Sequence, residues 1–295
     1  MQQRTIGDLI LLFVTFCWGV TFPLIENAVK VVDPFVFVTA RFFFATLLLI
    51  PFLYKNSHAI LNKKILKAGI ILGLLNVVSY GAQTKGLETI SAGQSAFITG
   101  TCVVMVPFLL PLFRMGTPTG LDVISSFFCL IGLSLLTGSD IHAFNIGCSW
   151  TLLCALAAAL TIIYLQKASE KQSSLNVLAF YQILFTSIFT SPFSLHKSYA
   201  PLFQHDALIA LLFCAIFATS LSLLLQTRYQ RFTTASRAAM IFCLEPLFAS
   251  IFSYWINGET LGVLALMGGL FILFSLLMPE IYRIVQAKIL SKEVL

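Results

Sequence analysis

The chain has 295 residues, of which 58% are hydrophobic and only 10% are charged, and its formal net charge is +6. Soluble domains carry roughly 25% charged residues, so this composition excludes a soluble globular protein. Lipid is the solvent in which such a chain is stable. The excess of basic over acidic residues must be explained by where the charges lie along the chain.

Ten apolar segments follow one another along the chain, and each is close to the roughly 20 residues that a helix needs to cross a bilayer. The intervals between them are too short to hold a soluble domain. We therefore predict an all-α polytopic membrane protein with ten transmembrane helices. The predicted spans are 8–29, 34–54, 65–86, 91–113, 119–138, 147–167, 175–195, 206–227, 233–256 and 259–281.

The lysines and arginines are distributed unequally between the two sides of this arrangement. With a cytoplasmic N-terminus, the inner segments hold Arg4, Lys55, Lys63, Lys64, Lys67, Arg114, Lys167, Lys171, Arg228, Arg231, Arg283, Lys288 and Lys292, and the outer loops hold Lys30, Lys85 and Lys197. The positive-inside rule then places both termini in the cytoplasm. We expect a multi-pass protein of the bacterial inner membrane, whose positive charge reflects topology rather than nucleic-acid binding.

A repeat relates the two halves at an offset of 143 residues. The run 83–85 (Gln-Thr-Lys) returns as 226–228 (Gln-Thr-Arg), and Ala92, Ala96 and Ile98 return as alanine, alanine and isoleucine at 235, 239 and 241. Each half has five predicted spans, and an odd number means that the second half enters the bilayer upside down. We predict two inverted five-helix repeats, 1–140 and 141–295, an arrangement found in many secondary transporters.

Among the ionisable residues inside predicted spans, three are candidates for a binding site, because a charge within the bilayer costs at least about 2.5–3.5 kcal/mol. Glu245 lies about twelve residues into the ninth span, roughly 18 Å along a helix, and Pro246 predicts a kink beside it. Arg41 lies about seven residues into the second span. Arg237 enters the ninth span by one turn, where it could instead reach the interface. We predict that Glu245, Arg41 and Arg237 bind substrate, while structural pairing is the alternative for each.

Uncharged polar and aromatic residues in the spans extend the candidate site. Gln83 and Gln226 are repeat partners, Gln94 and Tyr181 lie in other spans, and Trp18 lies in the middle of the first span. Asn76 and Gln182 lie in spans as well. Each of the polar groups could contact a solute or form a hydrogen bond between helices. Glu26 precedes Lys30 by four residues, the favourable order for a structural pair on a helix surface.

The deep charges do not follow the repeat. At the offset of 143 residues, Arg41 corresponds to Leu184 and Glu245 corresponds to Cys102. We therefore expect a symmetric scaffold with an asymmetric site, in which the unmatched charges provide chemical selectivity.

Motifs for other functions do not occur in the sequence. None of the seven cysteines forms a Cys-x-x-Cys pair, and there is no Gly-rich phosphate loop, catalytic triad spacing or zinc pattern. We expect buried thiols that behave as small hydrophobic groups, no metal site and no cofactor. An intramembrane enzyme would need paired aspartates or a His-rich metal site, and a channel would need a continuous hydrophilic lining.

Several short motifs, in this order over the whole length, resemble the drug/metabolite transporter superfamily of the ten-helix EamA type. They are Trp18-Gly19 with Phe22, Pro34 with Arg41, residues 86–93 (Gly-Leu-Glu-Thr-Ile-Ser-Ala-Gly), residues 97–100 (Phe-Ile-Thr-Gly), Val106-Pro107, Leu244-Glu245-Pro246 and Gly258-Glu259. The resemblance implies alternating access around a central cavity, with the fifth and tenth helices more peripheral. The first repeat has Gly116-Thr117-Pro118 where the second has Gly-Glu, so a role of Glu259 would not be shared.

From these observations we expect a secondary transporter, not an enzyme, that carries small polar metabolites. Amino acids or related zwitterions are the leading substrates. Nucleotide-derived solutes such as S-adenosylmethionine, with stacking on Trp18, and drugs are the alternatives. The expected partners are a small-molecule substrate and the lipid bilayer, with no nucleic acid, and the expected assembly is a monomer or a weak homodimer.

Overall fold

The computed structural model describes residues 2–137, 145–172, 174–258 and 262–293, and this part of the chain contains helices and no strands. The first half contains α1 (Gln2–Ala28), α2 (Pro34–Leu49), η1 (Ile50–Ala59), α3 (Lys63–Gly86), α4 (Ala92–Gly100), α5 (Cys102–Leu109), η2 (Leu110–Phe113) and α6 (Gly120–Thr137).

The second half follows the same order. It contains α7 (Ile146–Ser169), α8 (Leu175–Thr190), η3 (Ser191–Phe193), η4 (Ala200–Phe203), α9 (His205–Phe213), η5 (Cys214–Leu221), α10 (Ser222–Tyr229), η6 (Gln230–Phe232), α11 (Ala235–Phe242), α12 (Glu245–Asn257) and α13 (Val263–Glu293). The segment η5 is a π-helix that joins α9 to α10 into one long rod.

The helices match the predicted spans. Eight helices in the described residues are long and apolar enough to cross a membrane, and two shorter apolar helices, Gly120–Leu135 and Leu266–Met278, coincide with the fifth and tenth predicted spans. The all-α polytopic fold with two inverted five-helix repeats is therefore confirmed. Glu259 and the predicted repeat boundary at residue 140 lie outside the described residues.

Local sequence signals account for the helix starts. The Asp33 carboxylate accepts hydrogen bonds from the backbone N–H groups of Phe35 and Val36, and Pro34 occupies the first turn, where no backbone donor is needed. The side chains of Asn62 and Asn145 cap α3 and α7 in the same way. These caps allow short loops to reverse the chain between long apolar helices.

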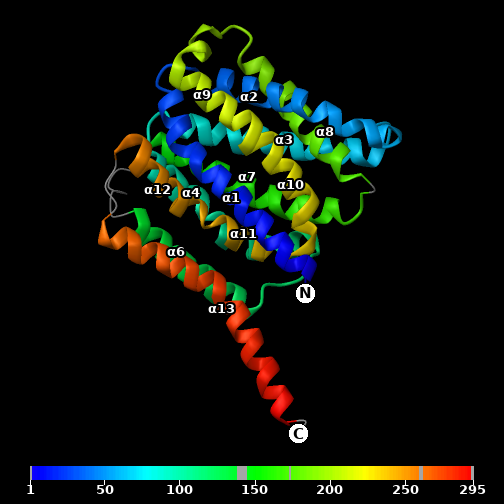
Figure 1. The fold of residues 1–295 in the computed structure, drawn as a ribbon, viewed down its shortest axis with the longest axis vertical. Coiled ribbons are helices and arrows are strands. Elements are labelled where there is room, and N and C mark those ends of the chain that lie inside the picture. Colours follow the sequence, from blue (N-terminus) through cyan, green and yellow to red (C-terminus); the bar gives the residue numbers. More distant parts are fainter. Residues whose placement is uncertain (1, 138–144, 173, 259–261, 294–295) are drawn as a thin grey trace.

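The packing of the two halves follows their repeat (Figure 1). α1 packs against the rod α9–η5–α10, as α7 packs against α3, and α2 packs against its equivalent α8. α6 and α13 pack against each other at one side of the bundle. This agrees with the peripheral position that the resemblance implies for the fifth and tenth helices.

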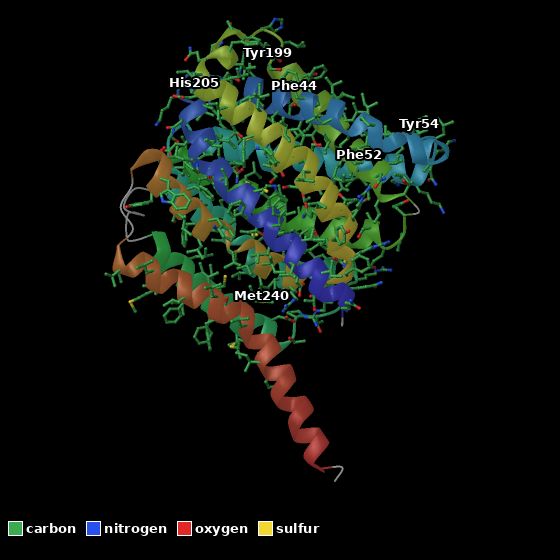
Figure 2. The ribbon with its side chains drawn as sticks, in the orientation of Figure 1. Phe44, Phe52, Tyr54, Tyr199, His205 and Met240 are labelled. Carbon is green, nitrogen blue, oxygen red and sulfur yellow. The ribbon has the colours of Figure 1, made fainter. Side chains whose placement is uncertain are left out.

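The outer surface of the bundle is apolar (Figure 2). Large side chains such as Phe44 and Phe52 project outward and are nearly half exposed, and Trp255 is 69% exposed. Polar side chains such as Asn76, Gln182 and Gln226 are instead buried within the bundle. This is the distribution expected for a protein whose solvent is lipid, since buried polar groups can find partners only inside the bundle.

The predicted pair of Glu26 with Lys30 is wrong. Lys30 Nζ donates to Asn27 Oδ1, while Glu26 Oε2 accepts from the Ala92 backbone N–H at 3.2 Å and from Asn257 Nδ2 at 3.3 Å. The carboxylate thereby caps the start of α4, where the helix dipole favours a negative charge. The Glu26 carboxylate therefore binds the Ala92 backbone, 66 residues away in the sequence, in preference to the neighbouring Lys30. Water solvates the lysine ammonium group readily.

Candidate functional site

The fourth helix of each repeat is interrupted at equivalent positions. In the first repeat, the Thr101 backbone N–H donates to Ile98 O between α4 and α5. In the second repeat, Leu244 N–H donates to Ile241 O between α11 and α12. Both turns tighten to an i to i−3 hydrogen bond, and both pairs are separated by the repeat offset. The breaks are therefore a property of the repeated scaffold.

The two breaks meet inside the bundle. The buried Cys243 thiol donates to the Gly100 carbonyl at 3.3 Å, and these two residues are themselves 143 positions apart. α4 also packs against α12, and α5 packs against α11. A contact between repeat-equivalent residues lies close to the axis that relates the repeats. Gly100 is thus a small residue at the point where the two helices meet, where a larger side chain would hold them apart.

Glu245 is the first residue of the half-helix α12. The positive end of the helix dipole stabilises a negative charge at that position. In the described part of the chain, no side chain donates a hydrogen bond to the carboxylate, and no basic group forms an ion pair with it. Glu245 is therefore held by its backbone position and leaves its oxygen atoms available to the cavity.

Arg41 is almost completely buried in α2, with 1% of its surface exposed. Its Nε donates to Thr219 Oγ1 at 2.6 Å, and its guanidinium lies 4.8 Å from the centre of the Tyr80 ring. One buried nitrogen, Nη2, has no hydrogen-bond partner. The hydroxyl and the ring thus fix the guanidinium, and one edge is left to bind an anion.

The π-helical segment η5 anchors the site on one side. It presents the Thr219 hydroxyl to Arg41, and its Ala218 carbonyl accepts a hydrogen bond from the Trp18 indole N–H at 2.9 Å. A π-helical turn shifts the direction in which the following side chains point and leaves carbonyl groups free for other partners. Such turns often occur at functional sites. Two site residues from α1 and α2 are therefore held by one irregular segment of the opposite repeat.

Arg41 and Glu245 interact electrostatically without a direct ion pair. They lie at a common cavity of about 70 Å³. That volume is enough for several water molecules. The sequence left open whether these two residues pair with each other. Both residues line one cavity without forming a direct ion pair.

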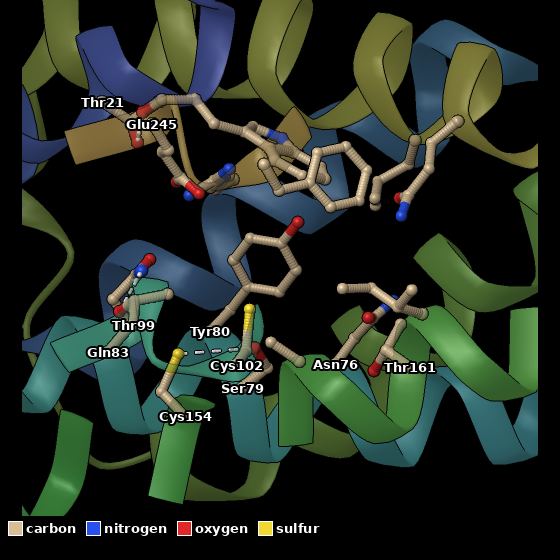
Figure 3. Close-up of a pocket in the computed structure, with 17 residues that line it drawn as sticks. Thr21, Asn76, Ser79, Tyr80, Gln83, Thr99, Cys102, Cys154, Thr161 and Glu245 are labelled. Atoms are coloured by element: carbon tan, nitrogen blue, oxygen red, sulfur yellow. Dashed lines mark hydrogen bonds between the residues drawn. The ribbon is translucent and has the colours of Figure 1, made fainter. Parts of the chain in front are cut away.

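Residues predicted from the sequence meet at this cavity from helices of both repeats. Trp18, Arg41, Gln83, Gln226 and Glu245 all line it. Figure 3 shows Glu245, Thr21, Gln83 and Thr99 on one side of the Tyr80 ring, whose hydroxyl points into the cavity. Gln83 Nε2 donates to Thr99 Oγ1 at 3.4 Å, which ties α3 to α4 beside the charged groups.

The other predicted site residues lie elsewhere. Arg237 forms an ion pair with Asp8 at 2.8 Å and lines a separate groove between α1, α11 and α13. Gln94 Nε2 contacts Cys148 Sγ at 3.5 Å, which joins α4 to α7. The Tyr181 hydroxyl donates to the Ile60 carbonyl. The structure does not bring these three residues to the cavity.

Sequence reasoning missed part of the lining. Tyr80, Ser79, Thr21 and Thr99 line the cavity with Cys102, Cys154 and Thr161, and Asn76, which the sequence placed in a span without assigning it to the site, joins them. A signal was present in the third predicted span. The positions 76, 79, 80 and 83 follow the i, i+3, i+4, i+7 spacing of one helix face. A polar stripe on an otherwise apolar helix would have predicted an inward face.

The chain is similar to known proteins over most of its length. A model of the EamA-like transporter family matches residues 5–138 and 145–279. An uncharacterized transporter of Archaeoglobus fulgidus is 32% identical over 279 residues, which cover 95% of this chain and 87% of that protein. The uncharacterized transporter YvbV of Bacillus subtilis (strain 168) is 26% identical over 92% of this chain and 90% of its own length.

A solved crystal structure shares the fold. It aligns with a TM-score of 0.77 over 95% of this chain and 98% of that chain, at 11% sequence identity. At this identity the likeness concerns the fold alone. The names of the two relatives describe transporters and specify no substrate.

Proposed function

The chain belongs to the EamA-like transporter family, and from this membership we propose that it is a secondary transporter of small polar metabolites, with amino acids and related zwitterions as substrates. Membership makes it a multi-pass membrane transporter. The substrate class, the mechanism and the location in a bacterial inner membrane with both termini in the cytoplasm are the proposed parts.

One observation carries the substrate class. Arg41 and Glu245 lie at one cavity inside the membrane-spanning bundle and do not pair with each other. A buried charge without a partner is costly, and a zwitterion supplies both missing partners. Its carboxylate would bind the free edge of Arg41, and its ammonium group would bind the Glu245 carboxylate. A solute with one charge would leave the other residue uncompensated.

Alternating access requires that the two ends of the bundle open in turn. α1 is tied at both ends: Asp8 pairs with Arg237 of α11 near the N-terminus, and Glu26 binds α4 and α12 near the other end. In the proposed mechanism, rocking of the two inverted repeats breaks one tie while the other holds. The paired breaks at the centre give both repeats a flexible point at the depth of the substrate.

Counterflow in proteoliposomes tests the proposal. Radiolabelled amino acids are exchanged by the wild type and by Arg41→Gln and Glu245→Gln, with S-adenosylmethionine included as a competitor. Arg231→Gln and Glu88→Gln are matched controls, because they remove the same charges outside the cavity. We expect at least a tenfold loss in the cavity variants and wild-type exchange in the controls. Folded cavity variants that exchange at the wild-type rate would refute the assignment.

A further inference from the structure

The cavity has a second polar end that the charged groups do not use. Asn76 of α3 and Thr161 of α7 lie there (Figure 3). Gln226 of α10, which also lines the cavity, is linked through Gln230 to the Ile162 carbonyl beside Thr161. We infer that these three residues form a subsite for an uncharged hydrogen-bonding group on the substrate side chain, so that the carrier prefers amino acids with amide or hydroxyl side chains. This inference rests on the proposed function and deepens it.

The subsite is separated from the charged end by an aromatic ring. In Figure 3, Asn76 and Thr161 lie on one side of Tyr80, and Glu245 lies on the other. The helix geometry agrees, because Asn76, Tyr80 and Gln83 follow one another on one face of α3. Asn76 and Tyr80 are four residues apart, a rise of roughly 6 Å. The side chain of a bound amino acid needs to pass only this one ring to reach Asn76 from the charged end.

Asn76 is the residue that points to a ligand. It is 99% buried, yet its Nδ2 has no hydrogen-bond partner among the described residues. A buried amide in a protein interior is normally paired, because an unpaired polar group is destabilising. The unpaired amide faces the cavity. A polar group of the substrate would therefore complete its hydrogen bonding.

The neighbouring side chains define which group fits. Thr161 Oγ1 donates to Ala157 O at 2.8 Å, so its hydroxyl can only accept from a ligand. Gln226 Nε2 donates to Gln230 Oε1 at 2.9 Å, so its Oε1 is the atom left to accept. With the Asn76 amide, whose unpaired Nδ2 carries two N–H groups, this end offers donors as well as two or more acceptors and carries no charge. An amide or hydroxyl both donates and accepts, whereas a charged side chain would lack a counter-ion here.

Competition between isosteric amino acids tests the inference. Counterflow is measured for three pairs of similar shape: glutamine with methionine, asparagine with leucine, and threonine with valine. We expect the wild type to prefer the polar member of at least one pair by tenfold or more, because a site that binds a polar group rejects the analogue that lacks it. Asn76→Leu should reduce that ratio at least tenfold and retain exchange of the apolar member.

Two further variants make the result decisive. Thr161→Val removes a hydroxyl with little change of shape, and it should lower the same ratio even where Asn76→Leu does not fold. Gln94→Leu removes an amide outside the cavity and should leave the ratio unchanged. Zwitterion exchange without a polar preference, or a preference that both cavity variants retain, would overturn the subsite alone. A wild type that exchanges no zwitterion would overturn the proposed function and the subsite together.

Discussion

Replacing Gly19 with alanine tests how closely α1 holds the half-helix that begins with Glu245. A Cβ atom built on Gly19 would lie 2.4 Å from Phe248 Cβ and 3.1 Å from both the Glu245 carbonyl oxygen and the Ala249 nitrogen. Carbon atoms in van der Waals contact stand about 3.5–4.0 Å apart. These neighbours are backbone or Cβ atoms, so a change of rotamer cannot relieve the overlap. α12 would therefore have to retreat by about 1 Å or more.

The expected effect of Gly19→Ala is both structural and functional. Overpacking of this kind typically costs about 1–3 kcal/mol, and a change of 1 kcal/mol moves the melting midpoint of a chain of 150–250 residues by about 2–4 °C. We expect the midpoint of the purified protein in detergent to fall by roughly 2–12 °C. Counterflow should fall more than tenfold, because Glu245 moves with α12 while Arg41 stays in place.

Gly93→Ala is the matched control for this substitution. Gly93 also lies in a helix, but an added Cβ would meet no atom within 4 Å. Alanine is a better helix former than glycine, so this variant should melt at or above the wild-type temperature and transport normally. A Gly19→Ala protein that melts and transports like the wild type would refute the close packing of α1 on α12 and the account of how Glu245 is positioned.

Three other predictions address the anchors and the topology. Thr219→Val should raise the KM for zwitterions at least tenfold with little change in maximal rate, because Arg41 loses the hydroxyl that orients it. Thr219→Ser keeps a hydroxyl and should retain the wild-type KM. An equal rise of KM in both variants would contradict this role. Asp8→Asn and Arg237→Gln should each lower the free energy of unfolding by about 1–3 kcal/mol, and the double variant should lose less than the sum, whereas additive losses would show that the pair is not coupled. A fluorescent protein fused after residue 293 should fluoresce and alkaline phosphatase fused after Lys197 should be active, and the reverse result would invert the proposed topology.

The helices and their arrangement could be predicted from the sequence because the bilayer imposes a simple rule. Backbone groups in lipid must pair internally, so long apolar runs become helices, and the offset of 143 residues reveals the repeat. The breaks were harder to predict. Pro246 predicts a kink at Glu245, and the structure has a tightened i to i−3 turn just before it. The equivalent break at Thr101 has no proline beside it and follows from packing against the other repeat.

The candidate site could be predicted in part. Charge at mid-depth identified Arg41 and Glu245, because lipid makes unpaired charges costly wherever they occur. Arg237 is predicted to bind substrate because it lies in the same span as Glu245. Its partner Asp8 is 229 positions away in the sequence, and no local pattern shows such a pair.

Thermal stabilisation by chemically blocked amino acids tests the central claim most directly. The purified protein is melted with each of the twenty amino acids, and with the carboxyl-amidated and N-acetylated form of each. A ligand at 100 times its Kd stabilises by about 2.7 kcal/mol. The account predicts that at least one free amino acid raises the midpoint by several degrees and that both of its blocked forms fail, because each lacks one of the charges that Arg41 and Glu245 bind. Equal stabilisation by a free amino acid and its blocked forms, or stabilisation by none of the twenty, would contradict the account.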